Sequence, residues 1–150
     1  MKNKIFETDN SLAPLFLRIG LGLVVFAHGA QKLFGWFNGY GFTGTMKFFT
    51  ESEGLPWVLG FLIIILESIG ALALVAGFAT RFLAASLGLL ALGIILTTRI
   101  EFGFFMNWFN NQAGEGYEFF IFWIAMAFSL LITGGGKYAA DKLLIKSKLN

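Results

Sequence analysis

The sequence predicts an all-α membrane protein, a bundle of four transmembrane helices. Hydrophobic residues occupy 57% of the 150 positions and charged residues only 13%, whereas a soluble domain carries about 25% charge. The apolar residues gather in four runs, each close to the roughly 20 residues that cross a bilayer. The runs leave too few residues for a second domain, so residues 1–150 are expected to form one transmembrane domain.

The four apolar runs begin and end at recognisable signals. Pro14 falls in the first turn of the first run and Pro56 opens the second, where a helix tolerates proline. The third run is dense in alanine and glycine, which let membrane helices approach closely. The link Gly77–Arg81 between the second and third runs is long enough only for a tight turn, so these helices are expected to be antiparallel neighbours. The predicted spans are 12–34, 55–77, 81–98 and 117–133.

The first long loop contains a predicted short amphipathic helix, Phe42–Glu53, lying on the membrane surface. Phe42, Met46 and Phe49 recur at spacings of three and four and would share one face, with charged residues away from it. Gly41 and Gly54 bracket the segment as helix breaks.

The lysines and arginines predict the orientation. With both termini in the cytoplasm, the outer side carries only Lys32, Lys47 and Arg99, and the cytoplasmic side carries the other eight of the 11 basic residues. Positive residues favour the cytoplasmic side of a membrane, so both long loops are expected outside.

Composition also limits the chemistry. The net charge is only +2, so a nucleic-acid partner is not expected. The expected partner of the apolar runs is the lipid bilayer. There is no cysteine, which excludes disulfides, iron–sulfur clusters and covalently attached haem within this chain. With one histidine and no thiolate, no metal site is expected, and no flavin site is evident. Faces rich in small residues permit a homo-oligomer without requiring one.

A polar group stands at the end of the first apolar run. His28, Gln31 and Lys32 are three and four residues apart and should share a helix face. At 1.5 Å per residue, Glu67 lies about 15 Å and His28 about 21 Å above the inner boundary. We therefore predict a polar pocket in the outer half of the bundle, with Glu67 and His28 as catalytic candidates. Its predicted ligand-binding residues are Gln31, Lys32, Arg99, Tyr117, Glu118 and Trp36.

Each of these residues also has a purely structural interpretation. A charge at mid-bilayer costs at least about 2.5 kcal/mol, so Glu67 is expected to be paired, hydrogen-bonded or protonated, and it could simply join two helices. Lys32 and Arg99 could extend to the membrane surface as anchors, and Glu118 could cap its helix. The tryptophans could form an interfacial belt. Arg18, about one turn into the first span, is expected to reach the surface.

Several stretches resemble the DoxX family of small membrane proteins. They are LRIGLGLVVFAHGAQKLFGWFNGYGFTGT (17–45), EGLP (53–56), Glu67 with Gly70, GFATR (77–81), FGFFMNW (102–108), GEGYEF (114–119) and TGGGKYAADKLL (133–144). The resemblance implies a multi-pass four-helix protein of the bacterial inner membrane. Some family members are subunits of a thiosulfate:quinone oxidoreductase, and others are linked to quinone or catechol stress. The polar positions that it carries over are His28, Gln31, Lys32, Glu67, Arg81, Tyr117 and Glu118.

Two functions fit the sequence. In the first, the protein is redox-linked and binds a quinone or similar aromatic molecule, with donors for the carbonyl oxygens, a proton source, and aromatic walls. As an enzyme it would then be a quinone-linked oxidoreductase or a subunit of one, with electrons from a substrate or a partner redox subunit. In the second, it is a non-catalytic membrane scaffold that holds a partner through its outer loops.

Overall fold

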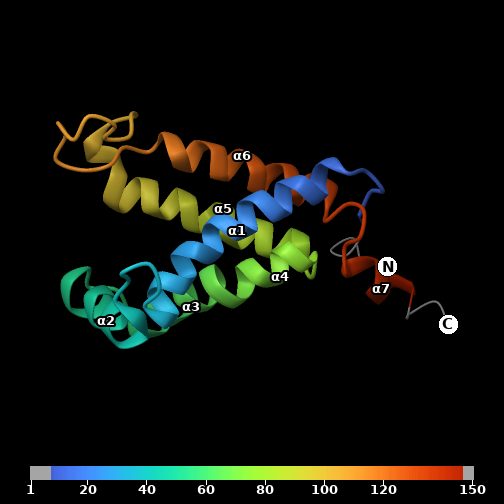
Figure 1. Cartoon of the computed structure of the whole chain (residues 1–150), viewed down its shortest axis with the longest axis horizontal. Coiled ribbons are helices and arrows are strands. Elements are labelled where there is room, and N and C mark those ends of the chain that lie inside the picture. Colours follow the sequence, from blue (N-terminus) through green and yellow to red (C-terminus); the bar gives the residue numbers. More distant parts are fainter. Residues whose placement is uncertain (1–7, 147–150) are drawn as a thin grey trace.

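The computed structural model describes residues 8–146, with side chains to residue 143. In this part of the chain all regular secondary structure is helical, without strands (Figure 1). Three helices are long and apolar enough to cross a membrane: α1 (Ala13–Phe34), the continuous helix Trp57–Ala76, and the helix Thr80–Phe102. A fourth apolar helix, α6 (Glu118–Thr133), has only 16 residues. The predicted spans thus match helices to within a few residues, and the last is shorter than a full span.

Two of the long helices are built from several segments. Trp57–Ala76 comprises α3 (Trp57–Ile65), η2 (Leu66–Gly70) and α4 (Ala71–Ala76). Thr80–Phe102 comprises α5 (Thr80–Ile94), η3 (Ile95–Arg99) and η4 (Ile100–Phe102). The segments η2 and η3 are π-helical turns, and a serine or threonine hydroxyl in each donates to the carbonyl four residues earlier. Such hydroxyls compete with the backbone N–H for that carbonyl, which favours a distorted turn.

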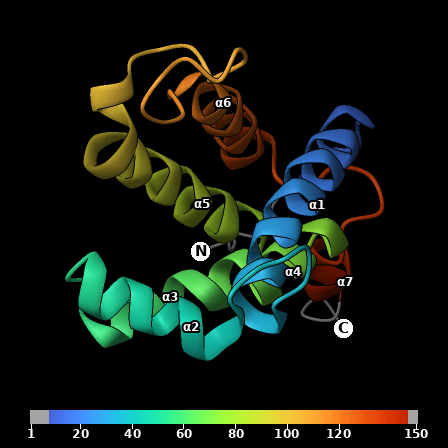
Figure 2. The ribbon, with the colours of Figure 1, turned by 60° about the vertical axis from the view of Figure 1, so that its left-hand side comes forward.

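The bundle has two distinct ends (Figure 1). One, the terminal end, holds the start of α1, the link between α4 and α5, and α7 (Asp141–Lys146). The other, the loop end, holds residues 35–56 and 103–117. Helix α5 packs along α6, and α1 packs on η2, α4 and α6. Toward the loop end α3 diverges from α5, as Figure 2 shows.

The core lies where α1, α4, α5 and α6 meet. Glycine and alanine let the helices approach: a Cβ at Gly88 of α5 would lie 3.5 Å from Ala127 of α6. The core side chains are Leu21, Val25, Ala71, Leu74, Leu83, Ala84, Leu87, Ala91, Trp123, Ala127 and Leu130.

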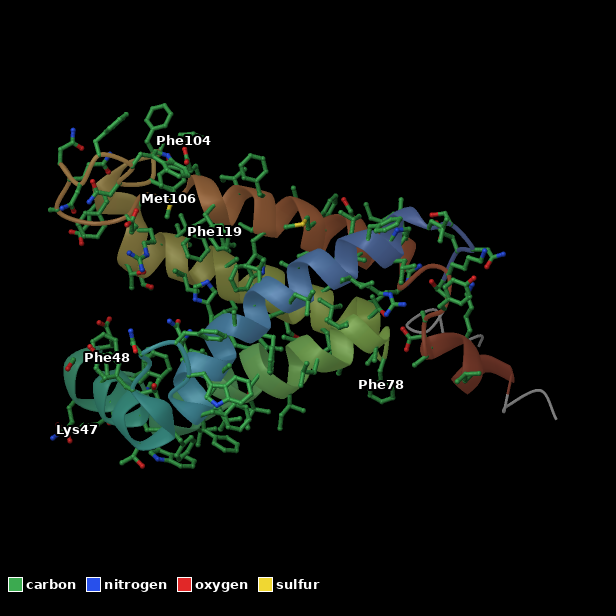
Figure 3. All side chains as sticks on the ribbon, in the orientation of Figure 1. Lys47, Phe48, Phe78, Phe104, Met106 and Phe119 are labelled. Atoms are coloured by element: carbon green, nitrogen blue, oxygen red, sulfur yellow. The ribbon has the colours of Figure 1, made fainter. Side chains whose placement is uncertain are left out.

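The amphipathic helix predicted in the first loop is present. It comprises α2 (Gly41–Lys47) and the π-helical turn η1 (Phe48–Ser52). Its apolar residues face α3: Phe42 meets Phe61 edge to face at 6.3 Å, and Met46 and Phe49 lie against Gly60. Lys47 points away from the bundle (Figure 3).

Arg18 corrects the sequence prediction, because its guanidinium does not extend to the surface. The residue is 2% exposed and donates to the carbonyls of Gly135 (3.0 Å) and Tyr138 (3.2 Å), with further bonds to those of Val75 and Lys137. Segment 134–140 folds back over the terminal end and supplies three of these four acceptors. The chain thus surrounds Arg18 with main-chain oxygen.

Asp141 is the acidic counterpart of Arg18 in this arrangement, because it too is held by main-chain groups. It is buried, and its carboxylate accepts the backbone N–H groups of Ala79 (2.6 Å) and Thr80 (3.0 Å) at the start of α5. These N–H groups have no partner within their own helix, and the helix dipole favours an anion there. We call Arg18, Asp141 and segment 134–140 the terminal lock.

Candidate functional site

The site is organised around a contact between α1 and η2. Gly29 of α1 lies directly against the backbone of Glu67, where any Cβ at position 29 would overlap the Glu67 carbonyl. This close approach places Glu67 beside the part of α1 that carries His28 and Lys32. Glycine at position 29 is therefore a geometric requirement of the site.

Glu67 forms an ion pair with Lys32. The glutamate side chain is 3% exposed and that of Lys32 is 24% exposed, so the pair extends from the bundle interior toward its surface. A buried carboxylate needs such a partner, because leaving one charge uncompensated costs several kcal/mol. The sequence predicted that Glu67 would be paired, hydrogen-bonded or protonated, and the structure shows it paired with Lys32.

His28 lies one turn below Lys32 and is exposed at the side of the bundle. Its ring meets that of Phe119 at 6.3 Å, which joins α1 to α6. Figure 3 shows Phe119 on the side of α6 that faces α1. The imidazole lies within the electrostatic influence of two charged groups, Lys32 and Glu67, and of the polar side chain of Gln31. We call His28, Lys32 and Glu67 the charged cluster.

Gln31 and Trp36 have local roles at the end of α1. Gly35 ends the helix in a left-handed conformation (φ 74°), which glycine adopts without strain. The Gln31 amide donates to the carbonyl of Phe37 at 3.3 Å and so supports the turn. The Trp36 ring packs on Phe34 and Phe26. Gln31 therefore shapes the loop beside the charged cluster, whereas Trp36 packs on aromatic residues of α1.

Tyr117 and Glu118 are bound to the second loop. The Glu118 carboxylate accepts the indole N–H of Trp108 at 3.0 Å, and the Tyr117 ring meets Phe104 edge to face at 5.6 Å. Figure 3 shows Phe104 and Met106 in this loop, next to the start of α6. The contacts of these two residues thus hold the loop on its helix.

Arg99 ends the π-helical turn η3. Its Nε atom is buried and has no hydrogen-bond partner among the described residues. A buried donor without a partner costs roughly 1–3 kcal/mol, so such a group is a candidate for binding a ligand oxygen. Of the predicted site residues, the structure pairs Lys32 directly with Glu67 and places His28 one helical turn away from Lys32, whereas Tyr117, Glu118 and Trp36 contact other residues.

Sequence reasoning missed several residues that shape the site. Phe119, which contacts His28, was not singled out, although it lies in the quoted GEGYEF stretch. Ser68 was also missed; its hydroxyl donates to the carbonyl of Ile64 at 2.6 Å within the turn that carries Glu67. Its position directly after Glu67 was the available signal. No group of three or more metal-binding side chains occurs among the residues that the structure describes.

Together these features define a small multi-span membrane protein with a charged cluster between helices. The chain belongs to the DoxX family, whose sequence profile matches residues 13–100, including all three residues of the charged cluster and Arg99. It is 30% identical over 148 residues to "Putative oxidoreductase CatD" of Bacillus subtilis (strain 168), an alignment that covers 99% of this chain and 96% of that protein.

A second relative is the inner membrane protein YqjF of Escherichia coli (strain K12). The identity is 33% over 117 residues, covering 75% of this chain and 81% of YqjF. No solved structure matches this chain.

Proposed function

We propose that this protein binds a quinone at the charged cluster and takes part in its reduction in the bacterial inner membrane. The observation that carries the proposal is the buried Glu67, held by Lys32 and lying near an exposed imidazole. A buried carboxylate is thereby near an imidazole that is exposed at the side of the bundle. The name of the relative CatD, which describes an oxidoreductase, supports a redox role.

The residues of the cluster suit a ring that carries two carbonyl oxygens. The Lys32 ammonium has three N–H groups and the structure uses one for Glu67, which leaves donors for a ligand oxygen. The neutral imidazole of His28 supplies one further N–H. Phe119, which contacts His28, and Trp36, which packs on Phe34, offer flat apolar surfaces.

Reduction of a quinone to a quinol takes up two electrons and two protons. In this proposal a reduced substrate or a partner redox subunit supplies the electrons. Glu67 and His28 relay these protons, because a carboxylate and an imidazole can each take up a proton that comes from water and pass it to a quinone oxygen. Arg99 adds positive charge and a buried donor.

The test is the binding of a soluble short-chain quinone to the detergent-purified protein. Binding is measured through the quenching of tryptophan fluorescence. Glu67→Gln and His28→Ala should each weaken binding at least tenfold. Glu118→Gln tests whether the site extends to the second loop. Lys47→Ala is the matched control, since Lys47 is 71% exposed and its side chain points away from the bundle. Equal binding by wild type, Glu67→Gln and His28→Ala would end the quinone proposal.

A scaffold role is the second candidate, and the second loop favours it. Trp108 and Phe109 are strongly exposed there, which is typical of surfaces that bind a partner or the bilayer interface. A scaffold should retain a partner protein through purification in mild detergent and should contain no quinone. A preparation with bound quinone and no partner would contradict it.

The proposal includes four spans with both termini in the cytoplasm, which places the loop end and the charged cluster toward the outside. With 16 residues, α6 is about 24 Å long, and a span this short is accommodated by local thinning of the bilayer. Because the chain has no cysteine, single cysteines at Asn38 and Asn110 report cleanly. A membrane-impermeant thiol reagent should label both in intact spheroplasts. Labelling only after lysis would contradict the topology.

A further inference from the structure

The terminal end has a hollow of about 510 Å³ whose walls come from both ends of the described chain. Asn10 lies on one side and segment 137–143 on the other, with Ala76 at the end of α4 between them. The hollow exists because segment 134–140 folds back over Arg18: Lys137 N–H donates to the carbonyl of Ser11 at 2.9 Å, and Ala140 N–H to that of Ala76 at 3.2 Å. Its position is therefore fixed by the terminal lock.

Two lysines give the hollow its charge. Lys142 donates to the side-chain oxygen of Asn10 at 2.7 Å, and the Lys137 ammonium lies 5.2 Å from the centre of the Tyr138 ring. Within the described residues, neither lysine has a carboxylate partner at ion-pair distance.

The nearest acids do not neutralise these lysines. Asp141 binds the backbone N–H groups of Ala79 and Thr80, and Asp9 accepts the N–H of Ser11 at 2.9 Å. Both carboxylates are thus committed to main-chain donors. Neither carboxylate therefore pairs directly with Lys137 or Lys142, and both ammonium groups keep unused N–H donors for a ligand.

The surroundings of the hollow are apolar. Alanines 76, 139 and 140 line it, and Tyr138 and Leu143 are strongly exposed beside it. Phe78 is also exposed nearby, and Figure 3 shows it at the end of α4 with its ring directed away from the bundle. The hollow lies at the level where α1 begins and where α4 and α6 end, and the ends of apolar spans mark the level of lipid headgroups.

We infer that this hollow binds the headgroup of an anionic phospholipid, with Lys137 and Lys142 on the phosphate and Tyr138 and Leu143 along the acyl chains. Basic pockets between membrane helices bind such headgroups. A free phosphate would gain nothing from the exposed apolar residues, so these residues favour a lipid. The site is separate from the charged cluster and does not depend on the proposed function there.

Native mass spectrometry of the full chain in mild detergent tests the inference. The added ligands are phosphatidylglycerol, phosphatidylcholine with the same acyl chains, and glycerol phosphate. Phosphatidylglycerol should remain bound while phosphatidylcholine is lost, and glycerol phosphate at the same concentration should not displace the lipid. Lys137→Ala with Lys142→Ala should weaken phosphatidylglycerol binding roughly 30-fold.

Two further variants separate charge from folding. Lys137→Arg with Lys142→Arg keeps both charges and should bind within a fewfold of wild type. Lys47→Glu makes the same change in net charge as the double alanine variant, but at the loop end, and should bind normally. Equal retention of the two lipids, unchanged binding by the double alanine variant, or displacement by glycerol phosphate would overturn the inference.

Discussion

The terminal lock and the charged cluster satisfy their buried charges in opposite ways. At the terminal lock, Arg18 donates to four backbone carbonyls and Asp141 accepts two backbone N–H groups. In the charged cluster, Glu67 depends on the side chain of Lys32. Main-chain partners are fixed by the fold, whereas a lysine side chain can rotate away. A charge satisfied by backbone serves structure, and one satisfied by a mobile side chain remains available for chemistry.

This comparison is sharpest at Arg18, where the largest effect is expected. Arg18→Ala should lower the free energy of unfolding by about 4 kcal/mol, because it leaves several buried carbonyls without donors. Arg18→Lys should rescue little of this loss, since an ammonium cannot match the guanidinium fork. Unfolding in mixed micelles measures both. A loss below about 1 kcal/mol would show that the lock contributes little to stability.

The next largest effect on the free energy of unfolding is expected from breaking the ion pair of the charged cluster. Lys32→Met alone should cost about 3 kcal/mol, because it leaves the Glu67 carboxyl group buried without its partner. The double variant with Glu67→Gln should cost at least about 1 kcal/mol less than the sum of the single changes. Strict additivity in this double-mutant cycle would mean that the two side chains do not stabilise each other.

A pair of glycines on α1 tests the contact that positions Glu67. Gly29→Ala should destabilise the protein by about 1–3 kcal/mol, since the new methyl group would overlap the backbone of η2. Gly20→Ala is the matched control on the same helix. Nothing lies within 4 Å of a Cβ there, so it should be neutral or stabilise by up to about 1 kcal/mol. Similar effects at both positions would argue against the close approach of α1 and η2.

The smallest effect is expected at His28. Because the imidazole is exposed and has one ring contact, His28→Ala should change the free energy of unfolding by no more than about 0.5 kcal/mol. Its coupling to Glu67→Gln should be smaller than that of Lys32, since Glu67 is paired with Lys32. A loss of ligand binding without a loss of stability would assign His28 to function. A large stability loss would instead make it a structural residue.

The sequence by itself determined the helices and the kinds of residue that had to find partners. Apolar length and periodicity depend on neighbours along the chain, so they predicted the helix bounds to within a few residues and the amphipathic segment 42–53, which the structure places at 41–52. The cost of a charge inside a bilayer predicted that Glu67 would be paired, hydrogen-bonded or protonated. The spacing of His28, Gln31 and Lys32 predicted a shared region of α1.

Only the tertiary structure decided which partner each charge received. Arg18 was expected at the surface because the first turns of a helix usually lie there, but segment 134–140 covers it from 117 residues away in the sequence. Lys32 reaches Glu67 because Gly29 lets two helices touch, and no pattern within one helix shows which neighbour will press against it. Helix formation is a local property of the chain, whereas the pairing of charges depends on packing between segments that are distant in sequence.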